Sequence, residues 1–180
     1  LINRSLADLK RSPEGFCLLC TDHKPDNFKV FASNQKRRNE NAYLYYCLLE
    51  DKDGNKAKKL GITKFKNRRL RFKSSYLYKD IFIHDEICEL TRAEAAGIEK
   101  RILLDTKTWI YEGEFSAEDD SKRDFDGKTE LRNLDMDDKL VISSIKNYLV
   151  EVKAKGWETF WLDNNPGKSE RKQLKKMRSR

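Results

Sequence analysis

The segment 64–73 is strongly basic, with six Lys and Arg in ten residues and no acidic residue. A second basic segment, the tail 168–180, has seven Lys and Arg and one Glu. Clustered cations of this kind are suited to contact phosphate groups, although a solvated basic face is the plainer interpretation. We therefore expect a polyanionic partner, and the candidate contacts are Lys64, Lys66, Arg68, Arg71, Lys73, Lys172, Lys175 and Lys176.

The pair Cys17-x-x-Cys20, followed by His23, has the ligand types and spacing of one half of a zinc site. A closed tetrahedral site needs four ligands, and the sequence offers no second pair nearby. Cys47 lies in an apolar run that predicts a buried strand, so it would have to leave that strand to contribute. The sequence argues against zinc at Cys17, Cys20 and His23 and favours two packed thiols.

Composition excludes several classes of protein. Of 180 residues, 38% are hydrophobic and 38% are charged, and no apolar run approaches the length needed to span a bilayer. The aromatic content of 11% argues against wholesale disorder, and the net charge of +8 favours a polyanionic partner. Nothing in the first residues resembles a signal peptide, so we expect a cytoplasmic protein with free thiols and one compact domain.

The middle of the chain predicts an antiparallel hairpin and a third strand. Residues 42–49 are all aromatic, aliphatic or Cys, which favours a buried strand. Asp-Lys-Asp-Gly-Asn at 51–55 is typical of a tight turn, and 58–62 is expected to return as the second strand. The third strand is expected within 80–90, where Ile and Phe are frequent.

Three helices are predicted around these strands. The spacing of Arg69, Phe72 and Tyr76 indicates one face of a basic helix. Thr91 begins a capping box with the Glu three residues later, and this helix should run to about Leu104 with Glu99 beside its apolar stripe. A third, amphipathic helix is expected over 138–153.

The domain organisation follows from the polar segments. The stretch 33–41 has no apolar period and predicts a linker. We therefore predict an N-terminal segment over 1–40, a central domain over 41–135, and a C-terminal helix with a basic tail over 136–180. The fold class is α+β, with a small three-stranded antiparallel sheet flanked by helices. Trp157, Phe160 and Trp161 are expected to be a packing cluster.

The order of these elements resembles the GIY-YIG nuclease family over about residues 42–132. Tyr43-Leu44-Tyr45 resembles the first motif and Lys59-Leu60-Gly61 the second. Arg69 lies eight residues beyond Gly61, as the family arginine does, and Glu99 takes the place of the helix glutamate. Gly127-Lys128-Thr129-Glu130 resembles a turn of some phage-type members. The chain departs from the family at Ala42, Lys59 and Lys73, where the motifs have Gly, Tyr and often His.

The resemblance implies hydrolysis of DNA with a divalent metal ion, Mg²⁺ or Mn²⁺, held by Glu99. Tyr45 or Tyr43 would take a proton from water, while Lys59 and Arg69 would stabilise charge on the phosphate. A phenol with the usual pKa near 10 is a poor base at neutral pH, so neighbouring cations would have to stabilise the phenolate. A single carboxylate holds Mg²⁺ loosely, so waters and substrate oxygens must complete its coordination.

We therefore expect a restriction- or homing-type endonuclease that cuts double-stranded DNA in a bacterium or a phage-infected cell. A homodimer would suit a palindromic target. A non-catalytic nucleic-acid-binding module on the same fold is the alternative, and the departures at Ala42, Lys59 and Lys73 would fit it. The plainer interpretations are core packing for the tyrosines and an ion pair with Arg92 or Lys100 for Glu99.

Overall fold

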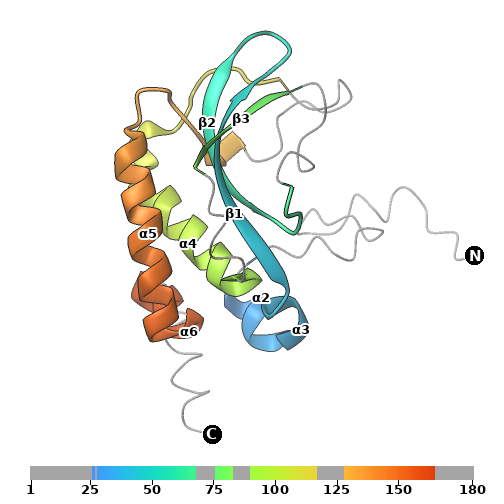
Figure 1. Cartoon of the computed structure of the whole chain (residues 1–180), viewed down its shortest axis with the longest axis vertical. Coiled ribbons are helices and arrows are strands. Elements are labelled where there is room, and N and C mark those ends of the chain that lie inside the picture. The colour runs from blue at the N-terminus through green and yellow to red at the C-terminus, as the bar shows by residue number, and fades with distance from the viewer. Residues whose placement is uncertain (1–25, 27, 68–75, 83–89, 117–127, 165–180) are drawn as a thin grey trace, which may run out of the picture.

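The computed structural model describes residues 26, 28–67, 76–82, 90–116 and 128–164 (Figure 1). Within these residues the chain has an α+β fold in which an antiparallel sheet packs against longer helices. The three longer helices are α4 (Arg92–Asp105), α5 (Asp138–Lys155) and α6 (Trp157–Asn164). Two short helices, α2 (Phe28–Ser33) and α3 (Gln35–Arg38), precede the sheet. None of the helices in the described ranges is long and apolar enough to cross a membrane.

The sheet is built on a long hairpin of β1 (Asn41–Glu50) and β2 (Lys56–Thr63). Two strands extend it, β3 (Leu77–Phe82) beside β1 and β5 (Leu131–Arg132) beside β2, in the order β3-β1-β2-β5. The short β4 (Leu90–Thr91) pairs with the first residues of β1. The predicted hairpin is confirmed, and it is longer at both ends than the sequence indicated. The third strand lies earlier than predicted and ends at Phe82, while residues 83–89 lie outside the described part of the chain.

The turn between β1 and β2 is organised by the carboxylate of Asp51. It accepts hydrogen bonds from the backbone N–H groups of Asp53 (3.0 Å), Asn55 (2.9 Å) and Ser116 (2.7 Å). Burial alone would raise the pKa of Asp51, but these donors outweigh it and lower that pKa below its ordinary value. Gly54 has φ of +80°, a conformation that suits glycine, so the predicted turn residues have the roles expected of them.

Helix α4 begins with the predicted capping box. The backbone N–H of Glu94 donates to Thr91 Oγ1 (3.3 Å), and the backbone N–H of Thr91 donates to Glu94 Oε2 (2.8 Å). The helix ends at Asp105, one residue beyond the predicted end. Because its start is fixed in this way, the positions of residues further along α4, including Glu99, are fixed relative to β1 and β4.

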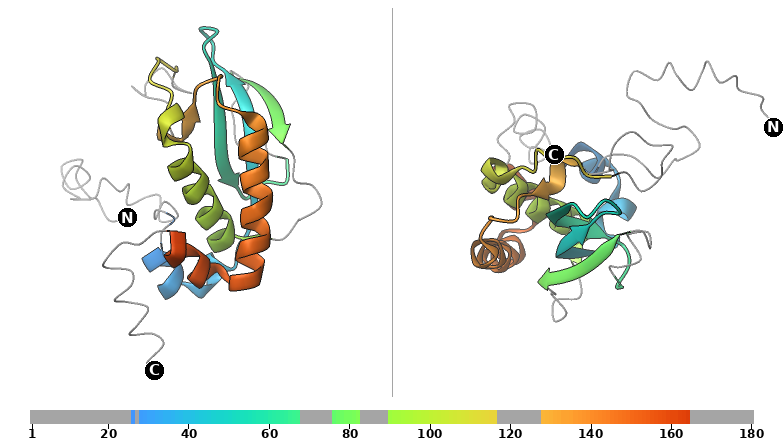
Figure 2. Two further views of the ribbon diagram at one scale, coloured as in Figure 1. Left: turned by 90° about the vertical axis from the view of Figure 1, so that its left-hand side faces the viewer. Right: turned by 90° about the horizontal axis from the view of Figure 1, so that it is seen from above.

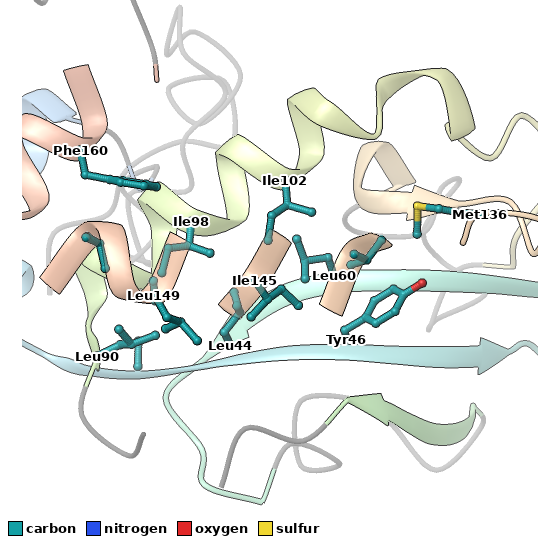
Figure 3. Close-up of a cluster of buried hydrophobic side chains, with 14 residues drawn as sticks. Leu44, Tyr46, Leu60, Leu90, Ile98, Ile102, Met136, Ile145, Leu149 and Phe160 are labelled. Atoms are coloured by element: carbon teal, nitrogen blue, oxygen red, sulfur yellow. The ribbon is translucent and has the colours of Figure 1, made fainter. Parts of the chain in front are cut away.

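Two hydrophobic clusters cover the two faces of the sheet. On one face, α4 and α5 lie side by side and pack Ile98, Ile102, Ile145 and Leu149 against β1 and β2 (Figures 2 and 3). On the other face, the second cluster contains Tyr45, Cys47, Leu49, Ala57, Tyr76, Phe115 and Leu131. Successive residues of β1 and β2 alternate between the clusters, as the pleat of a strand requires.

A third cluster joins the N-terminal and C-terminal helices. Phe28 and Phe31 of α2 are fully buried against α4 and α6, and both rings contact Trp157. The prediction of a packing cluster at Trp157, Phe160 and Trp161 is confirmed. The prediction of a linker over 33–41 is wrong, because this stretch contains α3 and leads directly into β1. The division into three parts stays a prediction.

Candidate active site

Lys59 is a buried cation on the face of the sheet that carries Tyr45 and Cys47. Its side chain is 2% exposed, and its ammonium nitrogen lies 2.5 Å from Glu130 Oε2. Glu130 is the last residue of the short 3-10 helix η3 (Lys128–Glu130), and its side chain is 32% exposed. A buried ammonium needs such a partner, because the loss of its water of hydration is costly. The pair joins residues that are 71 positions apart in the chain.

The turn that carries Glu130 is held in place by Arg132. Its guanidinium donates to the carbonyl oxygens of Thr129 (2.8 Å) and Leu131 (2.8 Å), which lie within the turn. It also donates to the carbonyl oxygen of Leu103 in α4 (2.9 Å) and to Thr106 Oγ1 (2.9 Å). Arg132 is buried, and burial lowers its pKa from the ordinary value. The two hydrogen bonds to Leu103 and Thr106 fasten this segment to the C-terminal end of α4, and the other two hold Arg132 against Thr129 and Leu131.

Glu99 reaches the same place from the middle of α4. It is partly buried, and burial together with the negative charge of Glu130 raises its pKa to about 8, while the charge of Lys59 opposes that rise. Its carboxylate also accepts a hydrogen bond from the backbone N–H of Ile62 in β2. Three charged side chains from α4, β2 and η3 therefore interact at one edge of β2.

The two candidate tyrosines lie on the same face of β1 but differ in exposure. Tyr45 is opposite Gly61 and only 2% exposed, whereas Tyr43 is opposite Thr63 and partly exposed. A Cβ atom at Gly61 would overlap Oη and Cζ of Tyr45. The ring of Tyr45 therefore lies across Gly61, which explains why this position of the second motif needs glycine.

Of the predicted site residues, Tyr45 and Lys59 lie on the same face of the sheet, and Lys59 is within electrostatic range of Glu99, while other predicted residues lie outside the described ranges. Lys64 and Lys66 are exposed, and residues 64–67 are not helical, so the predicted basic helix does not begin there. The remaining predicted residues that lie outside the described part of the chain are Arg68, Arg69, Arg71, Lys73, Lys172, Lys175 and Lys176, together with the Cys17, Cys20 and His23 motif.

Glu130 was not among the predicted site residues, although the turn that contains it was recognised. The Gly-x-Thr-Glu pattern at 127–130 could have indicated Glu130 as a site residue. The pattern gave no indication that Lys59 is its partner. The structure does not show the plainer interpretation of Glu99, an ion pair with Arg92 or Lys100, among the described residues. Arg92 pairs with Asp26 and Glu40, and the ammonium of Lys100 lies 5.2 Å from the ring centroid of Trp161.

The oxygen donors near Lys59 are suited to a hard cation. Glu99 and Glu130 supply two carboxylates, and Mg²⁺ is commonly held by one or two carboxylates with waters completing its octahedron. The described residues contain no cluster of three or more His, Cys, Asp or Glu side chains that could enclose a metal ion. Glu99 and Glu130 are the two carboxyl groups that act on each other electrostatically at this edge of β2.

Comparison with known proteins finds no family model, no curated protein and no solved structure that matches this chain. The function must therefore be argued from the geometry and charges of these side chains.

Proposed function

We propose that this protein is a metal-dependent endonuclease that hydrolyses phosphodiester bonds in double-stranded DNA. The observation that supports it best is the gathering of Lys59, Glu99 and Glu130 from three separate elements, beside a strand that carries Tyr43 and Tyr45. A buried ammonium near a carboxyl group with a raised pKa marks a candidate functional site.

Each residue has a part in the proposed reaction. Glu99, with Glu130 beside it, would hold Mg²⁺ or Mn²⁺, which when bound supplies a Lewis acid for the phosphate oxygens. Lys59 would donate to a phosphate oxygen as negative charge develops there. Arg69 would hold the phosphate through its planar fork, a task for which lysine is less suited.

Exposure distinguishes the two tyrosines as candidate bases. Tyr43 is partly exposed and can meet a water molecule, whereas Tyr45 is buried and its ring shapes the strand pair at Gly61. We assign proton transfer to Tyr43 and the support of β2 to Tyr45. Tyr43→Phe should then abolish cleavage without loss of stability, and Tyr45→Phe should keep most of the activity.

The experiment that tests this proposal measures the nicking of supercoiled plasmid in the presence of Mg²⁺. A reaction in which the metal is removed by a chelator is the blank. Wild type should nick the plasmid, and Glu99→Ala and Arg69→Ala should not. Glu151→Ala is a matched control, because Glu151 lies on α5 and forms an i,i+4 ion pair with Lys155 of the same helix. Absence of nicking by the folded wild-type chain over a range of Mg²⁺ and Mn²⁺ concentrations would reject the enzyme.

A non-catalytic DNA-binding module is the second candidate. The near-complete burial of Tyr45, the tyrosine that lies next to the second motif, favours it. Such a module would retard DNA in a gel at low salt without nicking it, and retardation would weaken steeply as salt rises. The same plasmid incubation, analysed on native and denaturing gels, separates the two functions.

A further inference from the structure

The open end of the β1–β2 hairpin gathers basic residues from segments that are far apart in the sequence. Helix α3 leads into β1, and residues 64–67 follow β2 at the same end, because Tyr43 of β1 pairs with Thr63 of β2. Helix α4 begins there too, since the backbone N–H of Arg92 donates to the carbonyl oxygen of Glu40 (2.7 Å) (Figure 1). Three segments therefore meet at one end of the sheet.

Positive charge exceeds negative charge at this end. The described residues of 26–41, 63–67 and 90–94 include seven Lys and Arg and three acidic residues. Each of these acids has a basic partner, since Asp26 pairs with Arg37 and Arg92, Glu40 with Arg92, and Glu94 with Lys153. Helix α6, which packs against α2, adds Glu158 and Asp163, and Asp163 pairs with Lys155. Within the described ranges, the cations of these three segments that form no ion pair are Lys29, Lys36, Arg38, Lys64 and Lys66.

Helix α3 is held in place by the side chains on either side of it. The carboxylate of Asp26 accepts from Nη2 of Arg37 in α3 (3.0 Å) and from Nε of Arg92 in α4 (2.9 Å), so it fastens the two helices together. The guanidinium carbon of Arg38 lies 5.6 Å from the ring centroid of Trp157 in α6. The cations of α3 are therefore presented at a fixed position relative to β1.

We propose that Lys36, Arg38, Lys64 and Lys66 form one surface, the hairpin-end surface, that binds the sugar-phosphate backbone of duplex DNA. This inference rests on the proposed function for its choice of DNA. Cations on fixed elements set the position of a duplex through its phosphates, without reading its sequence. Tyr43 is the third residue of β1 and lies at the same end, so a backbone bound here passes beside the proposed base. The stretch 33–41 thus gains a role in binding.

The test measures the affinity of the full-length chain for a fluorescent DNA duplex by anisotropy, with a chelator present so that no cleavage occurs. The affinity is measured over a range of NaCl concentrations, because the slope of its logarithm against the logarithm of salt reports the number of phosphates contacted. Lys36→Ala/Arg38→Ala should weaken binding at least about tenfold at about 0.1 M NaCl and reduce the slope by about two. Lys36→Arg/Arg38→Lys keeps both charges and should bind within about twofold of wild type.

Lys107→Ala/Lys139→Ala is the matched control, because it removes two exposed cations near the opposite end of α4 (Figure 1). This variant should keep the slope of wild type. Thermal unfolding of every variant is measured in the same buffer, since Arg38 packs over Trp157. Lys36→Ala alone changes an exposed side chain and should still reduce the slope by about one.

A slope unchanged in Lys36→Ala/Arg38→Ala, or reduced equally in the control, would overturn the proposal and leave a solvated basic face. Tighter binding of a double-stranded RNA of the same length would overturn the choice of DNA. Failure of this inference is distinct from failure of the nuclease. Plasmid nicking with an unchanged slope rejects only the hairpin-end surface, whereas the expected slopes without nicking reject only the nuclease.

Discussion

Lys58 and Lys59 are consecutive residues of β2, and their ammonium groups lie on opposite faces of the sheet. Lys58 pairs with Asp138 Oδ1 (2.9 Å) and donates to the carbonyl oxygen of Met136 (2.5 Å). The hydroxyl of Tyr46 donates to the same carboxylate (2.6 Å). Lys59 pairs with Glu130 on the other face but has a second carboxylate, Glu99, beside it.

The difference between the two lysines lies in the ionisable groups around each ion pair. On the Lys58 side, one ammonium meets one carboxylate, which lies in the first turn of α5, where a negative charge is favourable. That arrangement is complete and attaches α5 to the sheet. On the Lys59 side, a second carboxyl group, Glu99, is within electrostatic range of the ion pair, and burial, followed by the negative charge of Glu130, raises its pKa to about 8. The comparison teaches that a buried ion pair is a candidate for function when a further ionisable group with a shifted pKa lies beside it.

The largest expected effect is on cleavage. Glu99→Gln should lower the rate of plasmid nicking at least about 100-fold, because the amide cannot hold a divalent cation as the carboxylate would. Asp138→Asn changes the carboxylate of the Lys58 side and should alter the nicking rate per folded molecule less than threefold. Equal losses in the two variants would contradict the comparison. Rates are measured under conditions in which circular dichroism shows both variants to be folded.

The next effect is on stability and involves the glycine of the Lys59 side. Gly61→Ala should lower the free energy of unfolding by about 2–3 kcal/mol, because its Cβ would overlap the buried ring of Tyr45. Urea unfolding measures this loss. Adding Tyr45→Leu to Gly61→Ala should recover part of it, since the smaller side chain frees the space. If the double variant is destabilised by the sum of the single losses, the ring does not lie across Gly61.

The pH dependence of stability should differ between Glu99 and Asp51. The pKa of Glu99 is raised from its ordinary 4.5 to about 8, so the folded chain binds an extra proton between these values. The stability that Glu99 contributes is therefore present below about pH 4.5 and is lost as the pH rises through about 8. In metal-free buffer, Glu99→Gln should remove this decline of stability between about pH 4.5 and 8.

Asp51 should affect the pH dependence of stability in the direction opposite to Glu99. Its pKa is lowered, so its contribution is present above the unfolded-state pKa and is lost as the pH falls through the folded-state value. Asp51→Asn should therefore reduce the decline of stability in acid and leave the range above neutrality unchanged. Urea unfolding at a series of pH values measures both variants. A Glu99→Gln chain with the same slope as wild type above pH 5 would contradict the raised pKa of Glu99.

The smallest expected effect is on the Lys58 side. Tyr46→Phe removes the hydrogen bond to Asp138 and should lower the free energy of unfolding by about 1 kcal/mol. The pKa of Tyr46 is raised by burial and by Asp138, so the hydroxyl remains a donor at any pH used. Nicking by Tyr46→Phe should equal that of wild type. A clear loss of nicking would show that the two faces of the sheet are coupled.

The parts of the fold that could be predicted from the sequence are those specified by neighbouring residues. The hairpin followed from an apolar run and an Asp-Gly-Asn turn, and the start of α4 followed from Thr91 and Glu94. Both signals lie within ten residues or so of the structure that they determine. The prediction that Lys59 and Glu99 would meet required the resemblance to a known family, because no local pattern connects them.

The features that could not be predicted depend on contacts between distant segments. β5 has two residues and no period of its own, so only its pairing with β2 identifies it as a strand. Phe28 and Phe31 precede a polar stretch, and their burial depends on Trp157 and Trp161 at the other end of the chain. The ion pair of Lys59 with Glu130 could not be predicted for the same reason, because the two residues are 71 positions apart in the chain.

The hydrogen bonds of Lys58 and Lys59 close loops of about the same length, since the acceptors, the Met136 carbonyl and the Glu130 carboxylate, lie 78 and 71 residues away. Contacts at such separation form late when a chain folds, because the entropy of closing the loop must first be overcome. A nascent or partly unfolded chain would therefore possess the hairpin but lack the assembled charge cluster. Any reactivity that depends on this cluster would then begin only after the whole domain has folded. Incomplete chains would therefore lack this reactivity.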